Sequence, residues 1–125
     1  MSNLFPFEIV PALQGYAFVF PGQGSQSVGM GKDLYDNFDE VKNLYSEASE
    51  VLGYDIADLS FNGPVEELNK TFRTQPCLLV ASIAAYTALT IKGIKPSVVA
   101  GHSLGEYSAL VAAGSISFKD ALKIT

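Results

Sequence analysis

The residues best suited to chemistry stand in one short segment, Gly101-His102-Ser103-Leu104-Gly105. It fits the pattern Gly-x-Ser-x-Gly, in which a strand passes into a helix through a sharp turn that exposes the serine as a nucleophile. Gly101 and Gly105 have a steric role, because side chains there would collide across the turn. The N-terminus of the following helix would stabilise negative charge near Ser103. The pattern predicts a nucleophilic serine, and the alternative is a serine that only caps the helix.

A glycine-rich segment, Pro21-Gly-Gln-Gly-Ser-Gln26, could complete this site. A serine nucleophile needs an oxyanion hole, normally the N–H of the next residue together with an N–H from an early loop of the sheet. The amide of Leu104 fits the first position, and this segment can supply the second donor. The alternative is a phosphate-binding loop, although the segment lacks the P-loop lysine and its glycine spacing is not that of a dinucleotide fingerprint.

Two short apolar runs are predicted to be the strands that position these residues. Tyr16–Phe20 comes directly before the glycine-rich segment, and Pro96–Ala100 comes directly before Gly101. The first run has no polar face, which indicates a strand buried on both sides, as in a parallel sheet covered by helices.

The rest of the chain is predicted to be mainly helical. An amphipathic helix is expected from Asn37, which would cap it in a capping box with Glu40, to Gly53. Further helices are expected after Gly63-Pro64, over 77–91 with Pro76 opening it, over 104–113, and from Ser117 onward. Strands alternating with helices indicate an α/β fold.

Composition excludes several classes of function. The 125 residues are 48% hydrophobic and 17% charged, with a net charge of −5, which argues against binding to nucleic acid and to anionic membrane surfaces. Cys77 and His102 are the only cysteine and histidine, so no internal disulfide or structural zinc is expected. The N-terminus lacks the pattern of a secretory signal. We therefore expect a cytoplasmic protein without a metal or cofactor.

Five motifs, in this order, resemble the malonyl-CoA:acyl-carrier-protein transacylases and the related acyltransferase domains of polyketide and fatty acid synthases. They are Phe18–Gln26, Val28–Gly31, Asn62–Pro64, Thr74–Pro76 and Gly101–Ser108. The resemblance runs from about Tyr16 to Thr125. It implies a partial acyltransferase domain over 16–125 after an N-terminal extension over 1–15. The implied fold is the N-terminal portion of an α/β-hydrolase-like parallel sheet covered by helices, lacking the family's ferredoxin-like subdomain.

The resemblance also implies an activity. Ser103 would take a malonyl group from malonyl-CoA and pass it to the phosphopantetheine thiol of acyl carrier protein. The backbone N–H groups of Gln23 and Leu104 match the family's oxyanion hole, while Gln75 and His102 match residues that line the substrate site. His102 is not the family's base, since the side chain before an elbow serine projects away from that serine.

Two parts of the family's machinery are not found in the sequence. The family's histidine base and the arginine that binds the malonyl carboxylate both stand further along than these motifs, and the only arginine, Arg73, is outside the clamp position. We therefore expect a piece of a larger enzyme that is inactive or nearly so by itself. The alternatives are a serine hydrolase or thioesterase of similar fold, and a non-catalytic fragment that binds acyl carrier protein.

Overall fold

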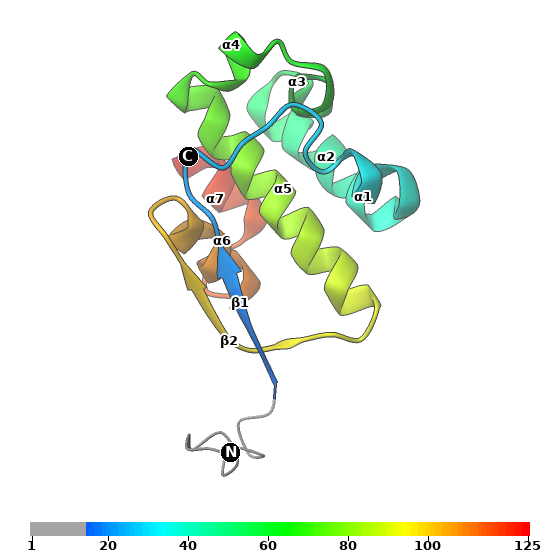
Figure 1. The fold of residues 1–125 in the computed structure, drawn as a ribbon, viewed down its shortest axis with the longest axis vertical. Helices are drawn as coiled ribbons and strands as arrows, with labels where there is room; N and C mark the ends of the chain where they lie inside the picture. Colours follow the sequence, from blue (N-terminus) through cyan, green and yellow to red (C-terminus); the bar gives the residue numbers. More distant parts are fainter. Residues whose placement is uncertain (1–14) are drawn as a thin grey trace, which may run out of the picture.

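The computed structural model describes residues 15–125, which form one small sheet and a set of helices around a central long helix (Figure 1). The predicted extension over 1–15 lies, except for Gly15, outside the described residues. In chain order the elements are β1 (Tyr16–Phe20), α1 (Lys32–Asn37), α2 (Asp39–Leu52), α3 (Ile56–Asn62), α4 (Val65–Leu68), α5 (Thr71–Ile91), β2 (Pro96–Gly101), α6 (Gly105–Ala112) and α7 (Phe118–Ile124).

The two strands lie side by side and run parallel, as predicted (Figure 1). Phe20 at the end of β1 is paired with Gly101 at the end of β2. The carboxyl ends of parallel strands therefore meet at one edge of the sheet. The segment after β1 and the turn after β2, which carry the predicted site, both leave from that edge.

The prediction that β1 is buried on both faces is wrong. Phe20 is its only buried residue, and Val19 is 71% exposed. Within residues 15–125 the sheet has two strands, so one edge of β1 has no partner strand. An apolar run shows that a strand suits burial on both faces, but neighbouring elements decide whether it is buried.

The central helix α5 begins earlier than predicted. It starts at Thr71, and Pro76 lies inside it rather than at its beginning. Pro76 removes one backbone hydrogen bond from the helix, but it is fully buried, and packing around it keeps the helix continuous. By length and composition α5 could cross a membrane, yet 56% of its most apolar stretch is buried inside the protein, which is typical of a core helix.

The predicted helix ending at Gly53 is present as α2, but its predicted cap is wrong. Phe38 occupies the N-cap of α2, and Asn37 instead ends α1, where its side-chain amide donates to the carbonyl of Asp33 at 2.7 Å. Gly53 ends α2 with a φ of 83°, as predicted. The short helices α1 and α3 were not predicted, because six or seven residues show too little periodicity.

The core lies where α2, α3, α5 and α7 meet. Tyr45, Ile56, Leu79 and Leu122 are its largest fully buried side chains from these four helices. Helix α6 packs against both strands and against α5, so it joins the sheet to the helical part. The predicted helices after Gly63-Pro64, Leu104 and Ser117 are present as α4, α6 and α7.

Candidate functional site

The turn between β2 and α6 holds Ser103 in an unusual conformation. Its φ is 58°, and within residues 15–125 it is the only residue other than glycine with a positive φ. Such a conformation costs an L-residue on the order of 1–2 kcal/mol and is kept only when the surroundings impose it. Leu104, not Ser103, stands at the N-cap of α6, so the structure does not support the capping alternative.

Backbone hydrogen bonds impose this turn. The His102 N–H donates to the carbonyl of Phe20 at 3.1 Å and ties the turn to the end of β1. The next bonds close the turn onto itself: the Gly105 N–H donates to the His102 carbonyl at 3.0 Å, and the Glu106 N–H donates to the Ser103 carbonyl at 2.9 Å. The exposed Ser103 thus sits on a backbone that is fixed on both sides.

The two glycines of the turn are sterically required. A Cβ at Gly101 would lie 2.0 Å from the backbone carbonyl group of Gly105. A Cβ at Gly105 would lie 2.1 Å from the carbonyl oxygen of Phe20. Any side chain at either position would push α6 away from the sheet, so the serine turn depends on both.

The glycine-rich segment, Pro21–Gln26, lies against the serine turn. A Cβ at Gly22 would meet the carbonyl oxygen of His102 at 2.4 Å and the Cβ of Ser103 at 3.2 Å. Only a glycine lets these two stretches of backbone approach so closely. Within residues 15–125, the backbone amides of Gln23 and Leu104 donate no hydrogen bond to a protein acceptor.

Two side-chain hydrogen bonds tie this segment to the start of α5 and to the turn before it. Gln23 Nε2 donates to Thr71 Oγ1 at 3.0 Å, and Gln26 Nε2 donates to Asn69 Oδ1 at 2.9 Å. Neither Asn69 nor Thr71 belongs to a motif that the sequence marks as part of the site. They stand 43 and 48 residues from their partners, and no local pattern marks such a pair.

The two predicted substrate-lining residues are not brought together by hydrogen bonds. His102 is exposed, and within the described part of the chain its side chain makes no hydrogen bond to Ser103. Gln75 is partly buried on α5, one helical turn beyond Thr71, which accepts the bond from Gln23. Gln75 therefore lies on the same helix as a residue that contacts the glycine-rich segment.

Arg73 is engaged elsewhere. Its guanidinium lies 4.0 Å from the ring centroid of Tyr54, and its Nε is 3.5 Å from Oε2 of Glu67. Glu67 also accepts from Lys70 at 2.9 Å, and this bond, with the nearby charge of Arg73, lowers the pKa of the Glu67 carboxyl. Arg73 on α5 thus belongs to a packing and charge cluster with Glu67 of α4 and Tyr54 of the turn between α2 and α3.

Among residues 15–125, no group of three or more histidine, cysteine, aspartate or glutamate side chains could hold a metal ion. Cys77 is buried in the core, and burial raises the pKa of its thiol. A buried thiol that stays protonated is a poor nucleophile, so Cys77 is a packing residue.

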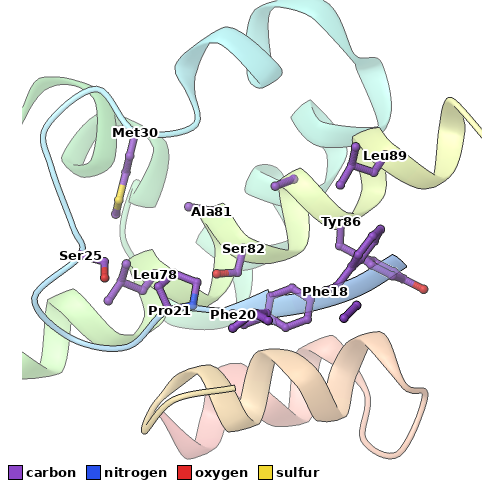
Figure 2. Close-up of a pocket in the computed structure, with 13 residues that line it drawn as sticks. Phe18, Phe20, Pro21, Ser25, Met30, Leu78, Ala81, Ser82, Tyr86 and Leu89 are labelled. Atoms are coloured by element: carbon purple, nitrogen blue, oxygen red, sulfur yellow. The ribbon is translucent and has the colours of Figure 1, made fainter. Parts of the chain in front are cut away.

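An apolar groove of about 450 Å³ runs between β1 and α5 (Figure 2). Phe18 and Tyr86 form one wall, with their rings edge to face at 6.1 Å, and Leu78 and Met30 lie farther along it. Ser103 does not line this groove. The groove reaches Phe20, whose carbonyl accepts from the His102 N–H of the serine turn.

Comparisons with known proteins identify the family of this chain. A family model described as "Acyl transferase domain" matches residues 17–125. The malonyl CoA-acyl carrier protein transacylase of Escherichia coli strain K12 is 56% identical over 110 residues, which cover 87% of this chain and 36% of that protein. The chain thus spans about one third of the length of such relatives.

Solved structures of such relatives have a similar fold. An acyl carrier protein S-malonyltransferase from Vibrio cholerae has a TM-score of 0.83 and 60% identity, covering 86% of this chain and 36% of that one. A malonyl-transacylase in complex with its type II polyketide synthase acyl-carrier protein has a TM-score of 0.84 and 55% identity, covering 89% and 36%. The α/β fold with a small parallel sheet matches these structures, and the chain belongs to the acyl transferase domain family.

Proposed function

We propose that this chain carries the nucleophile of a malonyltransferase, which moves a malonyl group from malonyl-CoA to the phosphopantetheine thiol of acyl carrier protein. The observation that carries the proposal is the strained Ser103, held at the end of β2 directly against Gly22. The similar proteins named as transacylases of malonyl-CoA and acyl carrier protein supply the substrate classes. Fatty acid biosynthesis is the corresponding role.

The reaction would proceed in two half-reactions. Ser103 Oγ attacks the thioester carbonyl of malonyl-CoA, the C–S bond breaks, and coenzyme A leaves as its thiol while a malonyl-serine ester remains. The carrier thiol then attacks that ester, and the serine Oγ recovers its proton. In both steps the amides of Gln23 and Leu104 would stabilise the negative oxygen of the tetrahedral intermediate.

The proton of Ser103 requires a base, and no residue in the described range 15–125 fits that role. His102 is the only histidine, and its side chain is not bonded to Ser103. Arg73, the only arginine, is paired with Glu67 and stacked on Tyr54, so it does not serve as a clamp for the malonyl carboxylate. We propose that the base and the clamp come from the portion that the relatives have beyond the matched stretch.

The finer points of the fold belong to the same proposal. The strands β1 and β2 would form part of an α/β-hydrolase-like sheet, residues 16–125 the first part of an acyltransferase domain, and residues 1–15 an extension. The family's ferredoxin-like subdomain would lie outside these residues. Gln75 and His102 would line the substrate site. The acidic composition and the single buried cysteine suit a reaction in the cytoplasm.

Intact mass spectrometry tests the activity. The chain is incubated with malonyl-CoA, both alone and co-expressed with the part of the Escherichia coli relative that lies beyond the matched residues. We expect a malonyl adduct on Ser103 that forms quickly in the complemented pair and about 10²–10⁴-fold more slowly in the chain alone, which lacks a general base. Ser103→Ala should abolish the adduct, while the exposed Ser115→Ala should retain it.

Other outcomes would support the alternatives. If the complemented pair hydrolyses malonyl-CoA at a rate that acyl carrier protein does not change, the chain belongs to a serine hydrolase or thioesterase. If acyl carrier protein binds but no adduct forms on the serine, the chain is a non-catalytic binding fragment.

A further inference from the structure

The side-chain amide of Gln26 links the glycine-rich segment to the turn between α4 and α5. Its Oε1 accepts from the Gly24 N–H at 2.8 Å, and its Nε2 donates to Asn69 Oδ1 at 2.9 Å. A backbone N–H can bond only to the oxygen of a side-chain amide, so the Gly24 contact determines which way the Gln26 amide faces. Its NH₂ group is then directed to Asn69.

The backbone N–H of Gln23 belongs to the preceding peptide unit, between Gly22 and Gln23. The Gly22 carbonyl accepts from the Ser25 N–H at 3.3 Å. The peptide between Gly22 and Gln23 is trans, so the Gly22 C=O and the Gln23 N–H point in opposite directions. Because the Gly22 oxygen is held inside the loop, the Gln23 N–H points out of the loop. The backbone at Gly22 lies against Ser103.

The loop therefore depends on partners that are far away in the sequence. Gly24 has a φ of 109°, a conformation that the loop must hold although glycine is free to leave it. Thr71 contributes a second tie by accepting from Gln23 Nε2. Each of these bonds is solvent-exposed and weak by itself, on the order of 1 kcal/mol, but together they restrict the backbone on the C-terminal side of Gln23 and the Gln23 side chain.

We propose that Gln26 and Asn69 are positioning residues that hold the Gln23 amide in the orientation of an oxyanion donor. This inference rests on the proposed function, because the orientation of that amide matters for catalysis only if Ser103 is acylated. Donors that are fixed before the reaction need no reorganisation when the negative charge develops. Asn69 acts through Gln26, so it should affect the rate of acylation rather than the binding of malonyl-CoA.

The experiment compares three variants by two readouts. Asn69→Ala removes the acceptor for Gln26, Asn69→Asp keeps an oxygen there, and Asn62→Ala removes a comparable exposed bond, to Asp58, elsewhere. The first readout is amide hydrogen exchange at Gly24, measured by NMR on the chain itself. The second is the rate constant and KM for formation of malonyl-Ser103 in the complemented pair described above.

For Asn69→Ala we expect faster exchange at Gly24 and an acylation rate constant about tenfold lower, with KM within about twofold of the wild-type value. That loss is smaller than the roughly 10²–10³-fold caused by removing an oxyanion donor outright. Asn69→Asp and Asn62→Ala should match the wild-type chain in both readouts. If Asn69→Ala folds poorly, Gln26→Met replaces it in the experiment. This variant also removes the acceptor for the Gly24 N–H, and the same two changes are expected.

The two readouts separate this inference from the proposed function. If the wild-type pair forms no adduct, the proposed function fails, and exchange at Gly24 still shows whether Asn69 holds the loop. The inference is overturned if Asn69→Ala leaves both Gly24 exchange and the rate constant unchanged. It is also overturned if only KM changes, or if Asn62→Ala slows acylation equally.

Discussion

At the scale of single residues, Ser103 combines exposure with backbone strain. Its φ of 58° is maintained by hydrogen bonds that fix the residues on either side of it. The neighbouring glycines at 101, 105 and 22 leave room for this turn, since a Cβ at any of them would lie within 2.4 Å of a backbone atom. The turn therefore presents a hydroxyl at the end of the sheet at a cost in stability.

This strain predicts that Ser103→Gly is more stable than the wild-type chain. Glycine adopts a positive φ without a steric cost, so we expect a gain of about 0.5–1 kcal/mol in the free energy of unfolding. Ser103→Ala removes the same hydroxyl but keeps the Cβ, so its stability should stay near that of the wild-type chain. Urea unfolding of the three proteins measures the difference. Equal stability of the glycine and alanine variants would show that the turn stores no strain.

The buried hydroxyl of Tyr45 should make the folded chain less stable at alkaline pH. It is 1% exposed, and burial, followed by the nearby Cys77 and Asp33, raises the pKa of its hydroxyl well above 10. Above pH 10 the unfolded chain loses this proton while the folded chain keeps it, so the free energy of unfolding should fall by about 1.4 kcal/mol per pH unit. The stability from this group is thus fully present below pH 10 and lost as the pH rises toward the folded pKa.

The test is Tyr45→Phe, measured by urea unfolding at pH 7 and pH 11. Among residues 15–125 the Tyr45 hydroxyl has no hydrogen-bond partner, so its removal should cost little at pH 7. At pH 11 the variant should be more stable than the wild-type chain by about 1 kcal/mol. Tyr107→Phe controls for loss of a more exposed hydroxyl. A similar gain in that control would contradict the assignment to burial at Tyr45.

At the scale of elements, the N-termini of the helices show which capping residues form the expected hydrogen bonds. Ser117 caps α7 by accepting from the Asp120 N–H at 3.0 Å, and Asp55 caps α3 by accepting from the Asp58 N–H at 3.0 Å. Asn37, the predicted cap of α2, makes no such bond, because α1 precedes it and uses it as a last residue. A capping pattern is therefore informative only when the chain before it is not already helical.

Replacing the capping residues should lower the free energy of unfolding by different amounts. Ser117→Ala and Asp55→Ala should each lower the free energy of unfolding by about 1 kcal/mol, because each leaves a helix N–H without its partner. Asn37→Ala should cost less than either, since it removes only one exposed bond, to the Asp33 carbonyl. Thermal unfolding followed by circular dichroism measures the series. A loss at Asn37 equal to that at Ser117 would mean that Asn37 does stabilise the start of α2.

At the scale of the whole molecule, the sheet is the least covered part. Val19 and Val98, one on each strand, are 71% and 58% exposed, and an apolar groove lies between β1 and α5 (Figure 2). The helices around α5, by contrast, enclose a continuous core. Uncovered apolar strands favour association through their edges and surfaces.

We predict that the chain binds a hydrophobic dye such as ANS and self-associates as its concentration rises. Val19→Thr combined with Val98→Thr should reduce both, because threonine keeps the β-propensity but lowers the apolar surface. Val28→Thr, at an exposed position outside the sheet, is the matched control and should change neither. Sedimentation velocity and ANS fluorescence are the measurements. Unchanged self-association in the double variant would show that the chains associate through another surface.

The sequence by itself determined the features that arise from local sterics. The strand before Gly101, the turn at Ser103, the helix after it and the glycine that ends α2 were predicted because neighbouring residues fix their backbone. Five ordered motifs were also enough to suggest the family that the comparisons show.

Tertiary structure decided everything that depends on distant partners. It placed Pro76 inside α5, left β1 exposed, engaged Arg73 with Tyr54, and tied the loop at Gln26 to Asn69 across 43 residues. The physical reason is that these features depend on which surfaces and hydrogen-bonding groups meet once the chain has folded. The type of a residue and its neighbours in the sequence do not specify these long-range contacts.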